Sequence, residues 1–460
     1  MPPEKSATAA HPRPATAPAQ HRGTPGGADA ADSPGAALAS GGGGNSPPAN
    51  DQDAMAVALA GLLSLAVAMG IGRFAFTPLL PMMLHDGVIS LPAASWLATA
   101  NYVGYWLGAI ACAVQPLLWA RWRPGRPLTH TTAVRIGLVA TVVLTAAMAL
   151  PEPALWPLWP LWRFLAGLAS ALVFVYLSGW CLARLSAMGR PALAGLIFVG
   201  PGLGIAVSGL AASGMVAGGA RASTAWAAFA VLAAVLTALA WPRLQGLVAA
   251  PAQASPSPVA GAQRGTLLLF TLAYGLAGLG YIVTATFLPV IARQALPGGS
   301  VWPDLFWPLF GLAVAAGALI TLRLPDWDRR KLLVACYALQ ALGVLLTVWW
   351  PSTAGFALGS LLLGLPFTAI TLFAVQEARR LRPHNPSALI GTLTAAWGLG
   401  QIAGPPLVAW LLPRSASAGQ GFERALLTAT GALVLGALLL TWLLMRHPMR
   451  HPLQPKPGAR

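Results

Sequence analysis

Arg73 is a charged side chain inside the first long apolar segment of the chain, between Gly72 and Phe74, with no Asp or Glu nearby in that segment. An arginine at the centre of a membrane helix costs about 2.5–3.5 kcal/mol on insertion scales, so it must face protein or a water-filled cavity. Its guanidinium is permanently charged and forms paired hydrogen bonds with carboxylate or phosphate. We therefore expect Arg73 to contact an anion or a substrate. The alternatives are a structural arginine that binds helix-end carbonyls, and a side chain that extends to the interface.

Polar and aromatic side chains in other apolar segments are further binding candidates. A ligand pocket needs a few such groups among many apolar ones. Hydrogen bonds between helices are an equally good use for any one of them. The candidates are Asn101, Tyr102, Tyr105, Tyr176, Tyr274, Tyr281, Trp397 and Gln401.

Glycines and prolines in these segments predict places where helices pack closely or bend. Small residues four apart, as in Gly200-xxx-Gly204, let two helices approach closely, and packing is their default role. Proline removes a backbone hydrogen bond, so a helix can bend beside it. The candidates for bending or gating are Gly70, Gly72, Gly200, Pro201, Gly404 and Pro405.

Acidic residues and histidines are absent from the interiors of the apolar segments. All 12 Asp and Glu and all 7 His fall in the terminal regions or near segment ends. Proton-coupled carriers commonly use an intramembrane Asp, Glu or His as a relay. If protons drive this chain, Asp86, Asp304 or Glu377 would have to serve from helix ends, although Glu377 is more simply an ion-pair partner of Arg379 or Arg380.

No pattern in the sequence predicts catalysis or metal binding. A paired acidic motif, a zinc spacing, a nucleophile elbow and a phosphate loop are all missing. Cys112, Cys181 and Cys336 lie in or beside apolar segments without metal-ligand spacing, as buried small hydrophobic residues do. We expect no metal, no cofactor and no enzymatic activity.

The composition indicates a membrane protein. Of the 460 residues, 56% are apolar and 9% are charged, whereas a soluble domain carries about a quarter charged residues. So few charges cannot cover a soluble globule, and we expect a lipid bilayer around the chain. The net charge of +16 would suggest nucleic acid in a soluble protein. Here the basic residues lie between apolar runs, which is typical of a topology signal, so no nucleic-acid partner is expected.

Twelve apolar segments approach the roughly 20 residues that a membrane helix needs. The alternation over about 10 residues that marks an outer-membrane strand is absent. The segments lie near 54–80, 93–114, 133–150, 158–180, 192–217, 223–241, 265–291, 304–322, 331–350, 354–376, 387–412 and 424–445.

The basic residues between these segments predict the orientation. Of the 28 Lys and Arg, 22 fall on the side of the termini, five on the other side and one, Arg73, within a segment. The five on the other side are Arg163, Arg221, Arg293, Arg414 and Arg424. Because basic residues favour cytoplasmic loops, both termini are predicted to be cytoplasmic.

A polar stretch at 242–264 divides the twelve segments into six and six. Both halves begin alike: Gly70-Ile71-Gly72 and Gly278-Leu279-Gly280 each precede a proline, Pro81 or Pro289, by nine residues counted from the last glycine. Such repeated halves are a transporter architecture. We predict an all-α integral membrane protein of twelve helices in two six-helix bundles. Its parts are a disordered cytoplasmic tail 1–50, a first bundle 51–241, a cytoplasmic linker 242–264, a second bundle 265–446 and a cytoplasmic tail 447–460.

The stretch Gly70-Ile-Gly-Arg-Phe-Ala-Phe-Thr-Pro-Leu-Leu-Pro81, followed by residues 94–105 (ASWLATANYVGY), resembles the YbfB/YjiJ-like branch of the major facilitator superfamily. This branch consists of bacterial inner-membrane transporters, and the likeness in helix number and halves extends over about 54–446. Residues 200–204 and 400–405 resemble incomplete forms of the glycine-proline motif that this superfamily's antiporters carry in helix five. Residues 326–330 resemble its charged loop between helices eight and nine.

The resemblance implies a monomeric carrier in the inner membrane that works by a rocker-switch, with helices 1, 4, 7 and 10 around a central cavity. Because Gly72 aligns with Gly280 in the repeat, Arg73 and Tyr281 occupy nearly corresponding positions. A cation in one half and an aromatic hydroxyl in the other could together hold an organic anion.

We therefore expect secondary or facilitative transport of a small organic solute, with an organic anion favoured. Direct ATP drive is not expected, because the sequence shows no nucleotide-binding domain, and a coupling proton or ion is left open. The alternative function is that of a transporter-like membrane receptor or regulatory protein, which binds a small ligand without moving it.

Overall fold

The computed structural model describes residues 51–122, 129–150, 152–246, 261–324, 328–383 and 386–446. Every regular element within these ranges is a helix, as the sequence predicts. The expected tails 1–50 and 447–460 lie outside the described residues, as does most of the expected linker 242–264.

Eleven helical segments of the described chain are long and apolar enough to cross a membrane. They coincide with eleven of the twelve segments predicted from the sequence. The twelfth, α13 (Pro386–Leu411), has 26 residues, but Gln401, Pro405 and Pro406 lower its hydropathy. By length α13 completes the predicted set of twelve.

The first six crossings are built mostly from long α-helices with short tighter or wider turns at their ends. Their elements are α1 (Asp51–Leu65), η1 (Ala66–Ile71), α2 (Phe76–His85), α3 (Leu91–Trp122), α4 (His130–Ala147), η2 (Pro153–Leu158), α5 (Trp159–Ala187), η3 (Pro191–Phe198), α6 (Val199–Ala217), α7 (Ala222–Ala240) and η4 (Trp241–Arg243).

The last six crossings follow the same plan. Their elements are α8 (Gly261–Ala295), α9 (Trp302–Thr321), α10 (Arg329–Trp349), α11 (Thr353–Gly364), α12 (Phe367–Leu381), α13, η5 (Leu412–Arg414) and α14 (Ala418–Arg446).

Two crossings are interrupted, and both interruptions have a local cause. The first crossing passes through the π-helical turn η1 and the non-helical residues 72–75 before α2 begins. The tenth breaks between α11 and α12, at Leu365 and Pro366. Proline cannot donate a backbone hydrogen bond, which accounts for the second break. The sequence analysis predicted a bend at Gly70 and Gly72 but not the break at Pro366.

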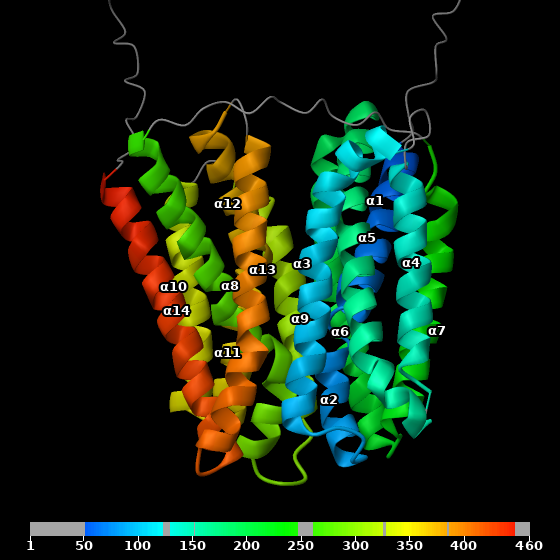
Figure 1. Ribbon diagram of the computed structural model, residues 1–460, viewed down its shortest axis with the longest axis vertical. Coiled ribbons are helices and arrows are strands. Elements are labelled where there is room, and N and C mark those ends of the chain that lie inside the picture. Colours follow the sequence, from blue (N-terminus) through cyan, green and yellow to red (C-terminus); the bar gives the residue numbers. More distant parts are fainter. Residues whose placement is uncertain are drawn as a thin grey trace, which may run out of the picture. The chain divides into compact units, whose positions relative to one another are not determined.

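The start of α1 and the end of α14, which are the first and last described elements, lie at the same end of the helices (Figure 1). We call this the terminal end, and we call the other the opposite end, where the loops 86–90 and 296–301 lie. Twelve crossings require this arrangement, because an even number returns the chain to the side where it started.

The first six crossings meet the last six mainly through α6 with α9, α3 with α13 and α2 with α8, and α9 also contacts α2 and η3. The hydroxyl of Thr77 donates to the carbonyl of Ala285 at 2.9 Å, and the hydroxyls of Tyr102 and Thr286 are 2.8 Å apart. These contacts lie at the middle of the helices and toward the opposite end. The interface between the two sets of crossings is therefore held by buried hydrogen bonds as well as by packing.

Candidate functional site

The interruption of the first crossing positions Arg73. In the π-helical turn, the amide of Gly72 donates to the carbonyl of Val67 at 2.9 Å, and that of Phe74 to Met69 at 3.3 Å. These bonds span five residues instead of four, so the turn widens, and π-helical turns occur frequently at functional sites. The break turns the guanidinium of Arg73 out of its own helix and toward the last six crossings.

Arg163 satisfies the carbonyls that the break leaves free. It lies in α5 and is 3% exposed. Its Nη1 donates to the carbonyl of Gly72 at 3.3 Å and its Nη2 to the carbonyl of Arg73 at 3.1 Å. The sequence analysis was wrong to count Arg163 among the loop residues of the opposite side. Its position inside the predicted segment 158–180 was the signal that could have identified it.

Asn101, a predicted binding residue, supports this arrangement from α3. Its side-chain amide donates to the carbonyl of Arg163 at 2.9 Å, and the residue is fully buried. Its Oδ1 is buried without a hydrogen-bond partner among the described residues. Asn101 therefore holds the backbone of Arg163, and it makes no hydrogen bond with Arg73 among the described residues.

The guanidinium of Arg73 is buried between the two sets of crossings, where the residue is 4% exposed. Its Nη2 donates to Oε1 of Gln401 on α13. The guanidinium carbon lies 4.0 Å from the ring centroid of Tyr105, a favourable cation–π contact. Its Nε has no hydrogen-bond partner among the described residues. No ion pair joins Arg73 to a carboxylate within the described ranges.

Gln401 continues the contact into the last six crossings. Its Nε2 donates to the hydroxyl of Tyr281 on α8. The ring of Tyr281 stacks on Trp397 at 5.2 Å, and Trp397 lies 4.8 Å from the ring of Tyr274. The structure thus brings Arg73 and five of the eight polar and aromatic candidates into one connected cluster. We call it the Arg73 cluster, and its members are Arg73, Tyr105, Tyr274, Tyr281, Trp397 and Gln401.

Close approach of α8 and α13 makes the second side of this cluster possible. A Cβ atom at Gly278 would lie 2.3 Å from the carbonyl oxygen of Trp397, and one at Gly400 would lie 2.1 Å from that of Gly275. Only glycine fits at such separations, because the obstacle is backbone. These glycines bring the side chains of α8 and α13 into one layer.

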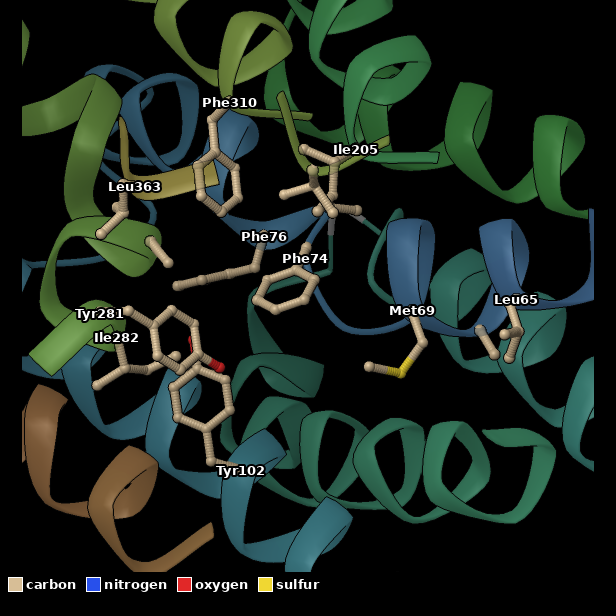
Figure 2. Close-up of a cluster of buried hydrophobic side chains, with 14 of the residues drawn as sticks. Leu65, Met69, Phe74, Phe76, Tyr102, Ile205, Tyr281, Ile282, Phe310 and Leu363 are labelled. Carbon is tan, nitrogen blue, oxygen red and sulfur yellow. The ribbon is translucent and has the colours of Figure 1, made fainter. Parts of the chain in front are cut away.

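The rings around Arg73 come from elements far apart in the sequence. Phe74, Tyr102 and Tyr281 belong to the turn before α2, to α3 and to α8, and they lie in one buried cluster (Figure 2). The sequence analysis missed Phe367, which follows the break at Pro366. Its ring lies 6.3 Å from Phe74 and 5.1 Å from Tyr281, edge to face in both cases. Phe367 thus connects the two interrupted crossings.

Three rings in this region keep part of their surface exposed. Tyr105, Phe367 and Trp397 are partly exposed, whereas Arg73 and Gln401 are buried. The polar pair therefore lies behind partly accessible aromatic surfaces. This combination can bind a solute with an anionic group at one end and a planar or apolar body.

Tyr176 lies apart from the Arg73 cluster. Its hydroxyl donates to Oε1 of Gln115 at 2.7 Å, and its ring meets that of His130 edge to face at 5.4 Å. These partners come from α3 and α4, within the first six crossings. The structure therefore gives Tyr176 contacts between helices of the first six crossings and no contact with Arg73.

The glycines and prolines proposed for bending occupy different settings. Gly70 and Gly72 lie at the interruption itself. Gly200 and Pro201 lie where the tight turn η3 passes into α6. Gly404 and Pro405 lie inside α13, which is helical through both residues.

The acidic residues near helix ends have local partners. Glu377 accepts two hydrogen bonds from Arg380, at 2.8 and 2.6 Å, as the sequence analysis expected of an ion pair. Asp304 pairs with Arg293 at 2.5 Å. Asp86 accepts a hydrogen bond from the amide of Ala222 at 2.7 Å. No group of three or more His, Cys, Asp or Glu that could hold a metal occurs among the described residues.

Comparison with known proteins agrees with this architecture. Among solved structures, the nucleoside transporter NupG is similar, with a TM-score of 0.62, 14% identity, and coverage of 86% of this chain and 99% of that one. A mutant of NupG is similar with a TM-score of 0.64 and 14% identity, and the match covers 85% of this chain and 99% of that one. At this identity the likeness shows the fold alone. No curated protein matches the sequence.

The sequence itself identifies the family. Residues 65–441 match the family described as "Uncharacterised MFS-type transporter YbfB", a stretch that includes most of the described helices. This match confirms the resemblance noted from residues 70–81 and 94–105. The chain therefore belongs to the YbfB family of MFS-type transporters, and it is a multi-pass membrane protein of a family that transports small molecules.

Proposed function

We propose that this protein is a secondary or facilitative carrier of a small organic anion, and that Arg73 binds the anionic group. The observation that carries the proposal is the setting of Arg73: a permanent cation, buried between the two sets of crossings, whose side chain has a neutral amide as its hydrogen-bond partner. A buried charge without a counter-charge typically costs about 3–5 kcal/mol. An anionic solute would supply the missing counter-charge.

The position of the cluster supports transport rather than binding alone. Arg73 and Tyr105 belong to the first six crossings, and Gln401 and Tyr281 to the last six, so a solute bound here would contact both. In a rocker-switch mechanism, the two six-helix bundles, 51–241 and 265–446, would rock about this site and open it to each side in turn. The interruptions at residues 72–75 and at Pro366 would give the first and tenth crossings the freedom to bend.

Charge placement supports the orientation. With Arg163 moved from the loops into a helix, four basic residues remain on the opposite side: Arg221, Arg293, Arg414 and Arg424. The contrast with the 22 on the terminal side becomes larger. We therefore propose that both termini are cytoplasmic. From the family resemblance we further propose a monomer in the bacterial inner membrane.

A thermal-stability screen of the purified protein tests the substrate class. The panel would contain acetate, benzoate, succinate, choline, glucose and uridine, the last because the structural neighbour NupG is a nucleoside transporter. A ligand at 100 times its dissociation constant stabilises the native state by about 2.7 kcal/mol. Stabilisation by carboxylates in the wild type, lost in Arg73→Gln, is expected. Arg414→Gln, which changes an exposed arginine, is the matched control and should respond like the wild type.

Flux measurement in proteoliposomes separates a carrier from a receptor. A stabilising carboxylate should enter vesicles that contain the wild type faster than protein-free vesicles, and vesicles that contain Arg73→Gln should take it up no faster than protein-free ones. Binding without flux would favour the receptor. Stabilisation by choline, glucose or uridine in both proteins alike would make Arg73 structural and the anion proposal wrong.

A further inference from the structure

The hydrogen bond between Arg73 and Gln401 joins a cation to a neutral acceptor in a buried place. Gln401 is 1% exposed and Arg73 4%. The two residues are 328 positions apart and belong to different sets of crossings. Gln401 holds two partners at once, because its carbonyl accepts from Arg73 while its amide donates to Tyr281.

We propose that Gln401 is a built-in surrogate ligand: its side-chain carbonyl occupies the place on Arg73 that a substrate carboxylate takes, and the substrate displaces it. The inference rests on the proposed function, because it assumes that an organic anion binds at Arg73. It goes further by naming the group that the anion replaces and by requiring a carboxylate-like acceptor on the substrate.

The chemistry of the two acceptors favours the exchange. A guanidinium presents five N–H donors in a fixed fork, whereas an amide carbonyl offers one oxygen. Nε of Arg73 has no partner among the described residues while Gln401 is bound. A carboxylate has two oxygens and can accept from Nε and Nη2 together, in a charge-assisted bidentate pair that is stronger than a bond to a neutral group.

The hydroxyl of Tyr281 supplies a second contact. In its bond with Gln401 the hydroxyl oxygen is the acceptor, so its own proton is not used in that bond. A displaced Gln401 could keep this bond while the Tyr281 proton is donated to the substrate. The rings of Tyr105 and Trp397, both partly exposed, would contact the remainder of the molecule.

The surrogate also connects binding to movement. While Gln401 is bound, it fastens α13 to the interrupted first crossing. When a carboxylate takes its place, this direct link between the two sets of crossings is lost and the solute contacts both instead. Without solute, Gln401 still supplies Arg73 with a hydrogen-bond acceptor. The empty carrier can therefore return to its starting conformation.

Three proteins test the proposal, with benzoate as the probe and its apparent dissociation constant measured from thermal-shift titrations. Gln401→Met has nearly the same length and no acceptor, so benzoate meets no competitor and should bind at least tenfold more tightly than to the wild type. Gln401→Glu places a carboxylate on Arg73 and should abolish the response. Gln340→Met is the matched control, since Gln340 is fully buried and its Nε2 donates to the carbonyl of Leu363. Its dissociation constant should equal that of the wild type.

Equal benzoate affinities in the wild type and in Gln401→Met, or no response in Gln401→Met, would overturn the surrogate role. If Gln401→Met does not fold, Gln401→Asn replaces it; its shorter side chain does not reach Arg73, and the same gain in affinity is expected. Failure of the proposed function has a different signature, because it would show as absence of carboxylate flux in the wild type whatever the order of these affinities.

Discussion

Arg163 donates hydrogen bonds to the backbone carbonyl of Arg73 while the side chain of Arg73 extends away from it to Gln401. Two buried arginines thus have separate tasks at one break in the first crossing. Arg163 satisfies backbone acceptors, and Arg73 presents a cation to the interface between the two sets of crossings. Binding of backbone carbonyls, one of the alternatives that the sequence analysis held open for Arg73, is carried out here by Arg163.

Removal of Arg163 should therefore destabilise the fold. Arg163→Met leaves the carbonyls of Gly72 and Arg73 without their donors, and each buried unsatisfied group costs about 1–3 kcal/mol. We expect the free energy of unfolding to fall by about 2–6 kcal/mol, measured by denaturation in mixed micelles. Arg163→Lys should restore part of the loss, because a lysine keeps the charge but not the fork of donors.

Arg424→Met is the control for this change, since Arg424 is exposed near the opposite end. It should leave the stability within about 0.5 kcal/mol of the wild type. A loss for Arg163→Met no larger than that of the control would show that the break is held by other contacts.

Loss of the hydroxyl of Tyr102 should loosen the interface between the two sets of crossings. Thr286 donates to the carbonyl of Ile282 at 2.7 Å, so Tyr102 is the donor in the bond between the two hydroxyls. A hydrogen bond contributes about 0.5–1.5 kcal/mol net to stability, so the fraction of molecules that are open at the opposite end should rise about 2- to 13-fold in Tyr102→Phe. The measurement is the rate at which an impermeant maleimide alkylates a cysteine at Thr77, which is 1% exposed.

The alkylation background would carry alanine at Cys112, Cys181 and Cys336, all of which are buried. Tyr337→Phe is the control, because the hydroxyl of Tyr337 donates to the carbonyl of Ala273 within the last six crossings. An equal rate increase in this control would mean that any lost tyrosine hydroxyl loosens the protein, and the Tyr102 bond would have no special part in gating.

Alanine substitution at two glycines of α6 should change the stability of the protein in opposite directions, because only one of them is closely packed. A Cβ atom at Gly200 would lie 2.2 Å from the carbonyl oxygen of Leu62, whereas one at Gly214 would meet nothing within 4 Å. Gly200→Ala should cost about 1–3 kcal/mol from overpacking. Gly214→Ala should be neutral or stabilise by up to about 1 kcal/mol through helix propensity. Thermal unfolding of the two variants distinguishes these outcomes, and similar midpoints would show that α6 and α1 can separate freely.

Transport should respond to membrane potential rather than to a pH gradient. Arg73 is permanently charged and has no carboxylate partner within the described ranges, so each cycle moves the charge of the anion. A potential of 100 mV is worth about 2.3 kcal/mol per elementary charge, which is about a 50-fold change in the accumulation ratio of a monoanion. An inside-negative potential should oppose uptake and favour efflux.

Proteoliposomes with an imposed potassium potential measure this effect. The control is a pH gradient without potential, which should drive no accumulation beyond that in protein-free liposomes, because a weak acid crosses the bilayer in its neutral form. Accumulation under the pH gradient alone that exceeds the protein-free level would indicate proton coupling, and the residues to replace would then be Asp86, Asp304 and Glu377.

The sequence by itself predicts the helical crossings, because hydropathy is a local property. Apolar runs of about 20 residues locate the helices whatever their neighbours are, and a charge such as Arg73 stands out against them. The same reasoning failed at Arg163, because a charge near the end of an apolar run is equally compatible with a loop. It also missed the break at Pro366, since a proline in a membrane helix need not interrupt it.

Only the tertiary structure decided which polar groups meet. Tyr176 and Tyr281 are indistinguishable as tyrosines in apolar segments, yet Tyr176 binds Gln115 and Tyr281 binds Gln401. The pairing of Arg73 with Gln401 depends on how closely α8 and α13 approach at their glycines and on how α3 packs against α13. Such contacts join residues hundreds of positions apart, and the local pattern of neither helix contains them.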